Sequence, residues 1–332
     1  MARPITVIAF VLGIGIATFR ANAAAPRLVT TLGTGKWEFT SLAFSPGGTL
    51  IATGDYSHTV KLWDPSTGKL RKTLTTHKGP VFVVAFSPKG QLVASGGHDT
   101  RVALRDVKSG QEVASLVVQF YQLHVVTTIA FSPSGAHLAV ALTDNSVQIW
   151  DTETKEQLHQ FLGARERLVP PFSLKHANAL AFSPDKQHLI LAGTGGRIWF
   201  WDRKAHKATA NLNASVYLEC VSVSGDGKLI FSAGLDGEIH VWDVGRQEIH
   251  KVFKNKTKSV YSLAVSPNGK ILAAGTHEGV VTLWDIEQEV KLASFPAHDG
   301  DVRAVEFSPD GMLLATASID KSVKVWRLAT DK

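Results

Sequence analysis

The sequence repeats one pattern of residues seven times from about residue 33 onward. Each copy has an apolar stretch, a turn of the Phe-Ser-Pro type, a stretch of small apolar residues, a polar turn and a closing stretch. The closing residues lie 42, 45, 51, 41, 42 and 42 positions apart. A period of about 40–45 residues predicts one small sheet per copy, with the sheets stacked side by side around an axis. The closing residues are Trp63, Arg105, Trp150, Trp201, Trp242, Trp284 and Trp326.

The turns and strands of each copy have the chemistry of antiparallel sheets. Six copies carry a glycine in the first turn, as in SPGG and SPDG, and only the fourth copy, SPDK, lacks it. Glycine readily adopts the positive φ that a tight turn between strands needs. The next stretch is small and apolar, as in LIATG and LLATAS, which predicts a strand covered on both faces. Helical periodicity is not evident beyond the N-terminal segment, so we expect an all-β chain.

With these motifs the chain resembles the WD-repeat (WD40) family from about Arg27 to Leu328. The second and fourth copies depart most, because Arg105 replaces the tryptophan and Gly195 occupies the polar turn. The resemblance implies a seven-bladed β-propeller of four-stranded antiparallel blades over residues 27–328. In this family an N-terminal strand completes the last blade. We therefore expect RLVTTL, at 27–32, to pair with SVKVWRL and close the ring.

The first 23 residues have the features of an export signal. Arg3 precedes an apolar stretch of 15 residues, and Ala21-Asn22-Ala23 supplies the pattern of small residues that a signal peptidase needs. The stretch is shorter than the roughly 20 residues of a membrane-spanning helix. We expect a signal peptide over 1–23, cleaved after Ala23, and a periplasmic or extracellular protein. An uncleaved membrane anchor is the alternative, because Arg20 is atypical of the region before a cleavage site.

The charge distribution limits the classes of partner, and the cysteine count limits the disulfides. The formal net charge is +6, and both signs are mixed along the whole length. This distribution favours a solvated surface over a nucleic-acid face. We expect no nucleic-acid partner, no stable membrane insertion once the signal is removed, and a monomer. The single cysteine, Cys220, excludes an intramolecular disulfide and lies in an apolar run typical of a buried thiol.

No group of residues indicates a catalytic, cofactor-binding or metal site. The segment HDGD at 298–301 lacks the spacing of a calcium loop, and the other histidines lack zinc-ligand spacing. The resemblance implies instead a hydrogen-bonded network inside a blade, made of a His, a Ser or Thr, a turn Asp and the Trp. His298, Asp320 and Ser318 could suggest a catalytic triad, but their spacing fits this network better. The residues expected in such networks are His77, Asp99, Asp144, Asp236, His298, Asp320 and Trp326.

The resemblance also implies that partner-contacting positions lie where the inner strands reach one face of the ring. Aligning the copies gives three such positions per blade, and this set of 21 holds three of the four tyrosines. Aromatic residues and arginine dominate binding hot spots. We predict partner contacts at Tyr56, Phe82, His98, Tyr217, Glu219, Tyr261, His277 and Arg303.

These features favour a non-catalytic scaffold that binds a protein or peptide at the top of the propeller. The alternative is an exported, hydrolase-like enzyme with its site at the channel mouth, where Glu38, Glu219 and Asp301 are the only acids of the predicted set. Binding of nucleic acid or of the cell envelope through the positive charge is a third interpretation, which a steep salt dependence would support. The inserted segment LGARERLVPPFSLKH should form a protruding loop, because Pro170-Pro171 oppose a regular strand.

Overall fold

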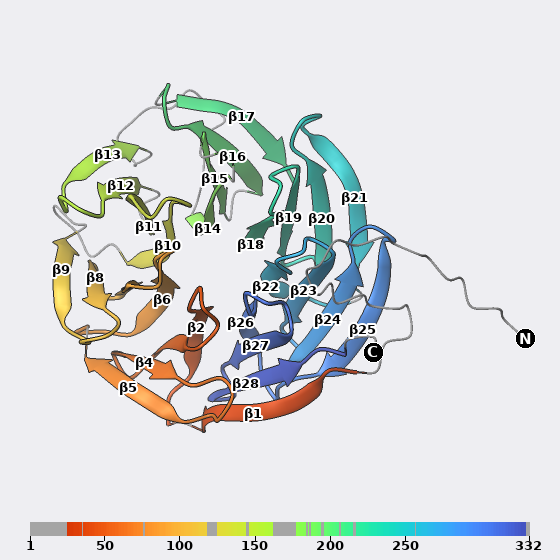
Figure 1. The fold of residues 1–332 in the computed structure, drawn as a ribbon. Coiled ribbons are helices and arrows are strands. Elements are labelled where there is room, and N and C mark those ends of the chain that lie inside the picture. The colour runs from red at the N-terminus through yellow and green to blue at the C-terminus, as the bar shows by residue number, and fades with distance from the viewer. Residues whose placement is uncertain are drawn as a thin grey trace, which may run out of the picture.

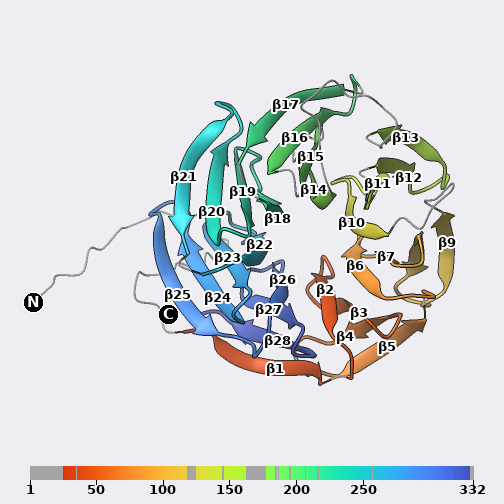
Figure 2. The same cartoon turned by 180° about the vertical axis from the view of Figure 1, so that it is seen from behind.

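The computed structural model describes residues 25–34, 36–75, 77–117, 125–143, 146–161, 177–183, 185, 187–193, 196–205, 207–214, 217–255 and 257–329. Seven four-stranded antiparallel sheets stand around a central axis, as Figure 1 shows from one side and Figure 2 from the other. The predicted all-β, seven-bladed propeller is confirmed. Within the described residues, no helix is long and apolar enough to cross a membrane. The expected signal peptide and the inserted segment at 162–176 lie outside the described residues.

Each blade runs from an innermost strand at the channel to an outermost strand at the periphery (Figure 1). The innermost strands are β2 (Phe39–Phe44), β6 (Val81–Phe86), β10 (Val126–Phe131), β14 (Ala177–Phe182), β18 (Leu218–Val223), β22 (Val260–Val265) and β26 (Val302–Phe307). The second strands are β3 (Ile51–Asp55), β7 (Leu92–Gly97), β11 (His137–Leu142), β15 (His188–Gly193), β19 (Leu229–Gly234), β23 (Ile271–Thr276) and β27 (Leu313–Ser318).

The third strands carry the closing residue of each copy. They are β4 (Thr59–Trp63), β8 (Arg101–Asp106), β12 (Val147–Asp151), β16 (Arg197–Asp202), β20 (Glu238–Asp243), β24 (Val280–Asp285) and β28 (Ser322–Arg327). The outermost strands are β5 (Leu70–Thr75), β9 (Glu112–Val117), β13 (Gln157–Phe161), β17 (Lys207–Asn213), β21 (Glu248–Lys254), β25 (Val290–Pro296) and, in blade seven, β1 (Arg27–Thr34).

The turn glycines adopt the backbone conformation that the sequence predicts. In the six copies with a glycine in the first turn, its φ lies between +68° and +78°. In each of these turns the glycine N–H donates to the backbone oxygen of the serine three residues earlier, at 2.7–2.9 Å. Residues with a Cβ rarely adopt this conformation, so glycine makes the tight link between first and second strands. The six glycines are Gly48, Gly90, Gly135, Gly227, Gly269 and Gly311.

The ring is closed by its two chain ends, as predicted. Strand β1 pairs antiparallel with β28, with Leu28 opposite Trp326 and Leu32 opposite Val323. Blade seven therefore has the order β1-β28-β27-β26. Leu32 is fully buried and belongs to a hydrophobic cluster that extends from Val325 in blade seven to Phe44 in blade one. Pairing the ends covers the outer edge of β28 and ties the last blade to the segment that leads into the first.

Neighbouring blades pack through their second strands and through aromatic side chains. All residues of β3 and β23 are buried, which confirms the prediction that these strands are covered on both faces. Gly54 lets blade two approach closely, since a Cβ there would lie 2.8 Å from Cγ1 of Val81. Farther out, Phe295 of β25 contacts Trp326 of the next blade at 4.9 Å between ring centroids. Burial of such aromatic rings supplies much of the stabilising apolar area.

Candidate functional site

Every innermost strand carries an irregularity at the same position near its start. The register with the second strand shifts across one residue in all seven blades. A bulge of this kind leaves a residue outside the ladder and changes the direction of its side chain. The seven residues are Thr40, Phe82, Thr127, Asn178, Glu219, Tyr261 and Arg303.

Six of these residues line one cavity of about 450 Å³ in the middle of the ring. The side chain of the seventh, Asn178, lies outside the described residues. Glu38, Tyr56 and Ile319, from loops on the same face, also line the cavity, and strand residues next to the bulges make up the rest of the lining. The residues before the bulges in β6 and β26, Val81 and Val302, are fully buried inside their blades. The bulges therefore bring a different side chain from each of six blades to one place.

Two pairs of aromatic rings stand at this cavity. The rings of Tyr56 and Phe82 meet edge to face, with centroids 5.9 Å apart. The rings of Tyr261 and His277 meet in the same way at 6.0 Å. Tyr56 keeps 39% of its surface exposed, so it can still cover an incoming group. Edge-to-face pairs fix ring orientation before binding, which lowers the entropy cost of capturing a ligand.

A charged cluster links blades six and seven beside the Tyr261 ring. Asp301, which is buried, accepts a hydrogen bond from Arg303 at 2.6 Å and lies 2.8 Å from Nδ1 of His277. The guanidinium of Arg303 stands 4.2 Å above the centroid of the Tyr261 ring. The cation therefore touches both a carboxylate and an aromatic face, and these contacts hold its side chain in a defined place.

The cavity alters the acidity of two of its own groups. Burial raises the pKa of Glu219 above its usual range, while the positive charge of Arg303 opposes that change. Burial also raises the pKa of the Tyr261 hydroxyl, again against the effect of Arg303. Perturbed groups in a cleft are typical of functional sites.

The predicted contact residues fall into two groups in the structure. Tyr56, Phe82, Glu219, Tyr261 and Arg303 line the cavity. The other three do not line it: His277 contacts Tyr261 beside it, whereas His98 and Tyr217 lie exposed at the ends of their loops.

Blade seven contains a continuous buried network. Nδ1 of His298 lies 2.8 Å from Asp320, and its Nε2 lies 2.7 Å from the hydroxyl of Thr316. The indole N–H of Trp326 donates to the same hydroxyl at 3.0 Å. Burial lowers the pKa of His298, whereas hydrogen bonds from Ser322 and His298 outweigh burial and lower the pKa of Asp320. Sequence reasoning did not single out Thr316, although Thr53 and Ser232 occupy the same place ten residues before their tryptophans.

The other network residues behave differently from blade to blade. In blade two, Nδ1 of His77 lies 2.7 Å from Asp99, and Arg105 in the tryptophan position donates to Glu112 at 3.0 Å. In blade five, Asp236 accepts a hydrogen bond from the backbone N–H of Glu238 at 3.1 Å. Asp144 lies outside the described residues.

Comparison with known proteins agrees with this geometry. The family model for the "WD domain, G-beta repeat" matches seven segments that cover more than half of the chain: 26–64, 68–106, 116–151, 170–202, 207–243, 247–285 and 289–327. The chain belongs to the WD40 family. Each matched segment ends at or just after the third strand of a blade, and the segments other than 170–202 begin at or next to the outermost strand of the preceding blade.

Several curated WD40 relatives are subunits of assemblies. Protein LST8 homolog of Drosophila melanogaster is 24% identical over 203 residues, 60% of this chain and 61% of the relative. Target of rapamycin complex subunit wat1 of Schizosaccharomyces pombe is 24% identical over 58% of each chain. Small ribosomal subunit protein RACK1 of Medicago sativa is 30% identical over 36% of this chain and 40% of the relative. The chain thus spans 61% or less of the first relatives that it matches.

Proposed function

We propose that this WD40 propeller is a non-catalytic scaffold that captures a protein or peptide partner at the channel mouth. The observation that carries the proposal is the convergence of the bulged residues on one cavity. A propeller ring holds these side chains rigidly, so little conformational entropy is lost on binding. The names of the relatives place those proteins in a target of rapamycin complex and in the small ribosomal subunit, which supports a role in assembly.

Charge at the cavity favours a partner that inserts a basic group. Glu38 and Glu219 contribute carboxylates to the lining, whereas Arg303, the guanidinium among the described lining residues, is already engaged by Asp301. Tyr56 and Phe82 offer aromatic faces to the alkyl part of a lysine or arginine side chain. The partner segment should therefore present a basic residue flanked by apolar ones.

Partner capture tests this proposal. The purified chain is used as bait in an extract of its native host, next to the Tyr56→Ala/Tyr261→Ala double variant. Removal of two hot-spot aromatics should weaken capture at least tenfold, since each such truncation commonly costs more than about 1 kcal/mol. The matched control is Leu70→Ala/Ile249→Ala, because these exposed residues lie on the outermost strands. Equal capture by all three baits would refute the channel mouth as the site.

The half-buried carboxyl of Glu219 is the feature that favours the second candidate, a hydrolase-like enzyme. Its raised pKa suits a general acid, and Glu38 lines the same cavity. Screening glycosidic and ester substrates addresses this candidate directly. Turnover that disappears in Glu219→Gln would replace the scaffold proposal with an enzyme.

We also propose that the protein is exported, with residues 1–23 removed. The support is the N-terminal sequence alone: Arg3, the apolar stretch after it and Ala21-Asn22-Ala23. N-terminal sequencing of the chain from its native host tests cleavage, and cell fractionation tests location. A protein that starts at Met1 in the membrane fraction would indicate an anchor, and one that starts at Met1 in the cytoplasm would overturn export.

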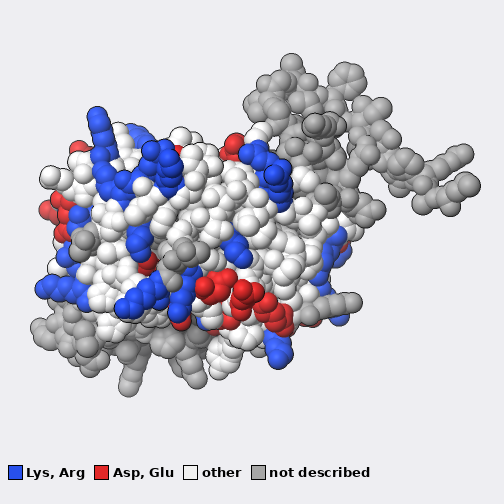
Figure 3. Space-filling view, turned by 90° about the horizontal axis from the view of Figure 1, so that it is seen from below, with Lys and Arg blue, Asp and Glu red and all other residues white. Residues whose placement is uncertain are grey.

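The propeller should act as a monomer without nucleic acid. Figure 3 shows basic and acidic side chains side by side on one side of the molecule, rather than a continuous basic face. Light scattering of the eluting protein measures its mass in solution. Retention on DNA that falls steeply between low and physiological salt would contradict this part of the proposal.

A further inference from the structure

Blade five brings two carboxylates and an imidazole together at the start of its third strand. Asp236 lies in the turn before β20, and Glu238 and His240 lie in the strand. Since alternate residues of a strand project to the same face, Glu238 and His240 share one side. One ligand atom from each of the three residues lies within 4.8 Å of the other two.

The other blades do not place this chemistry at the equivalent positions. In blade one a lysine, Lys61, occupies the place of His240, and its ammonium group binds Asp55. The six other sets are Ser57, Thr59 and Lys61; Asp99, Arg101 and Ala103; Asp144, Ser146 and Gln148; Gly195, Arg197 and Trp199; Glu278, Val280 and Thr282; and Asp320, Ser322 and Lys324.

The acids of blade five also lack the cation that such acids have elsewhere. In blades two and seven, a histidine 28 residues before the closing position pairs with the turn acid. Blade five has Ala214 at that place. Across the described part of the chain, no ion pair joins Asp236 or Glu238 to a lysine, arginine or histidine. Lys254 stands opposite Glu238 in the neighbouring strand β21 but forms no ion pair with it in the described structure. Two neighbouring carboxylates without a paired counter-charge repel each other and attract a cation.

The imidazole of His240 supplies a second and independent observation. The residue is 93% buried, and its Nδ1 is a buried atom without a hydrogen-bond partner within the described structure. Its ring packs against Trp242 at 6.1 Å between centroids. A buried polar atom left unpaired costs about 1–3 kcal/mol, so native structures rarely keep one without a bound group.

We propose that Asp236, Glu238 and His240 bind one divalent transition-metal ion of the zinc class. An imidazole and two carboxylates suit zinc, whereas calcium and magnesium prefer sites built of oxygen alone. Ligand-to-zinc distances of about 2.1 Å place tetrahedral ligand atoms about 3.4 Å apart, so a small closure from the present arrangement completes the site. Asp236 and Glu238 keep part of their surface in solvent, which leaves an entry path and a fourth position for water.

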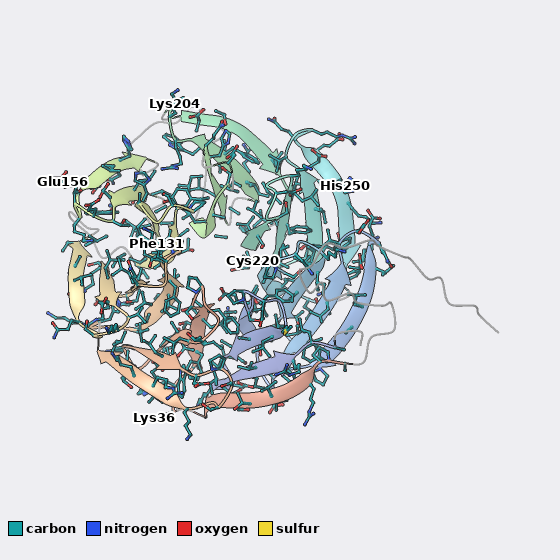
Figure 4. All side chains as sticks on the ribbon, in the orientation of Figure 1. Lys36, Phe131, Glu156, Lys204, Cys220 and His250 are labelled. Atoms are coloured by element: carbon teal, nitrogen blue, oxygen red, sulfur yellow. The ribbon has the colours of Figure 1, made fainter. Side chains whose placement is uncertain are left out.

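Metal titration of the full chain tests the site. The protein is stripped with a chelator and titrated with Zn²⁺ and, separately, with Co²⁺, whose visible absorption band reports four-coordinate geometry. We expect one equivalent of either ion, and at least a tenfold weaker affinity in Glu238→Gln and His240→Gln. The matched control is His250→Gln, because His250 lies on outer strand β21 with Nε2 3.6 Å from Glu289 (Figure 4). That variant should bind like the wild type.

Circular dichroism of the metal-free variants shows whether they are folded. If His240→Gln fails to fold, the metal affinities of Asp236→Asn and Glu238→Gln decide whether the site exists, because both acids keep part of their surface in solvent and their replacement should not disturb the core. Absence of saturable binding would overturn the proposal. The proposal would also be overturned if His250→Gln weakened metal binding as strongly as Glu238→Gln does, because the metal would then be held by scattered surface histidines.

Discussion

Glu306 holds blade seven to blade one at the point where the ring closes. One of its carboxyl oxygens accepts a hydrogen bond from the backbone N–H of Phe44 at 3.0 Å. The equivalent position, just before the end of the innermost strand, is Ala or Ser in the other six copies. Burial raises the pKa of Glu306 from 4.5 to about 8, although this hydrogen bond opposes the change. We predict that Glu306→Gln stabilises the propeller at alkaline pH.

The sign follows from the proton balance between the folded and unfolded states. Between pH 4.5 and about 8 the folded protein holds a proton on Glu306 that the unfolded chain has released. The contribution of this carboxyl to stability is therefore fully present below pH 4.5 and is lost as the pH rises through about 8. One pKa unit corresponds to about 1.4 kcal/mol, so the shift from 4.5 to about 8 gives an upper limit of about 5 kcal/mol for the stability that the propeller loses at high pH. Because solvent reaches part of the Glu306 side chain, we expect the stability lost at pH 8 to be about 2 kcal/mol. Glu306→Gln should recover this amount.

Thermal and urea unfolding of both proteins at pH 4.5, 6.5 and 8 measures this difference. Glutamine stays uncharged and can accept the same hydrogen bond, so the variant should match the wild type at pH 4.5 and melt a few degrees higher at pH 8. His298 and other groups titrate equally in both proteins and cancel. Glu156→Gln, at an exposed turn on the periphery (Figure 4), is the control and should not change stability. A difference that is constant with pH would refute the reasoning.

Three further predictions concern packing, the blade network and the thiol. Leu32→Ala, in the fully buried closing strand, should lower the free energy of unfolding by about 2–5 kcal/mol in urea titrations. Thr316→Val should cost about 1–3 kcal/mol by the same measurement, because His298 and Trp326 lose a shared partner. Burial raises the pKa of the Cys220 thiol, so a thiol reagent should modify it only as fast as the protein unfolds; rapid labelling of the native protein would contradict this.

The fold was predictable because each of its signals occurs several times. A turn glycine such as Gly48 or Gly311 specifies one hairpin, and the same residue recurs in six copies. The period then fixes the number of blades, and the unpaired strand at 27–32 fixes how the ring closes. An irregular copy, such as the one with Arg105, does not weaken the prediction, since its neighbours determine where that strand must lie.

The candidate site was predictable only in part. Register between the copies identified Glu219, Tyr261 and Arg303, because a bulge recurs at that position in every blade. It could not show that Asp301 contacts His277, since this contact joins two blades and depends on their relative rotation. The raised pKa of Glu306 likewise depends on a neighbouring blade, although a lone acid among small residues was visible in the sequence.

The bulges explain how one rigid fold can carry a variable site. A bulged residue makes no regular ladder pair, so the sheet constrains its side chain little. Accordingly the seven bulges hold residues as different as Thr127, Glu219 and Arg303, while the residues before Phe82 and Arg303, Val81 and Val302, stay apolar and fully buried. Replacing a bulged residue should therefore change what the channel mouth binds without changing the propeller. If Tyr261→Ala lowered the free energy of unfolding by as much as Leu32→Ala does, the bulged residues would belong to the core instead.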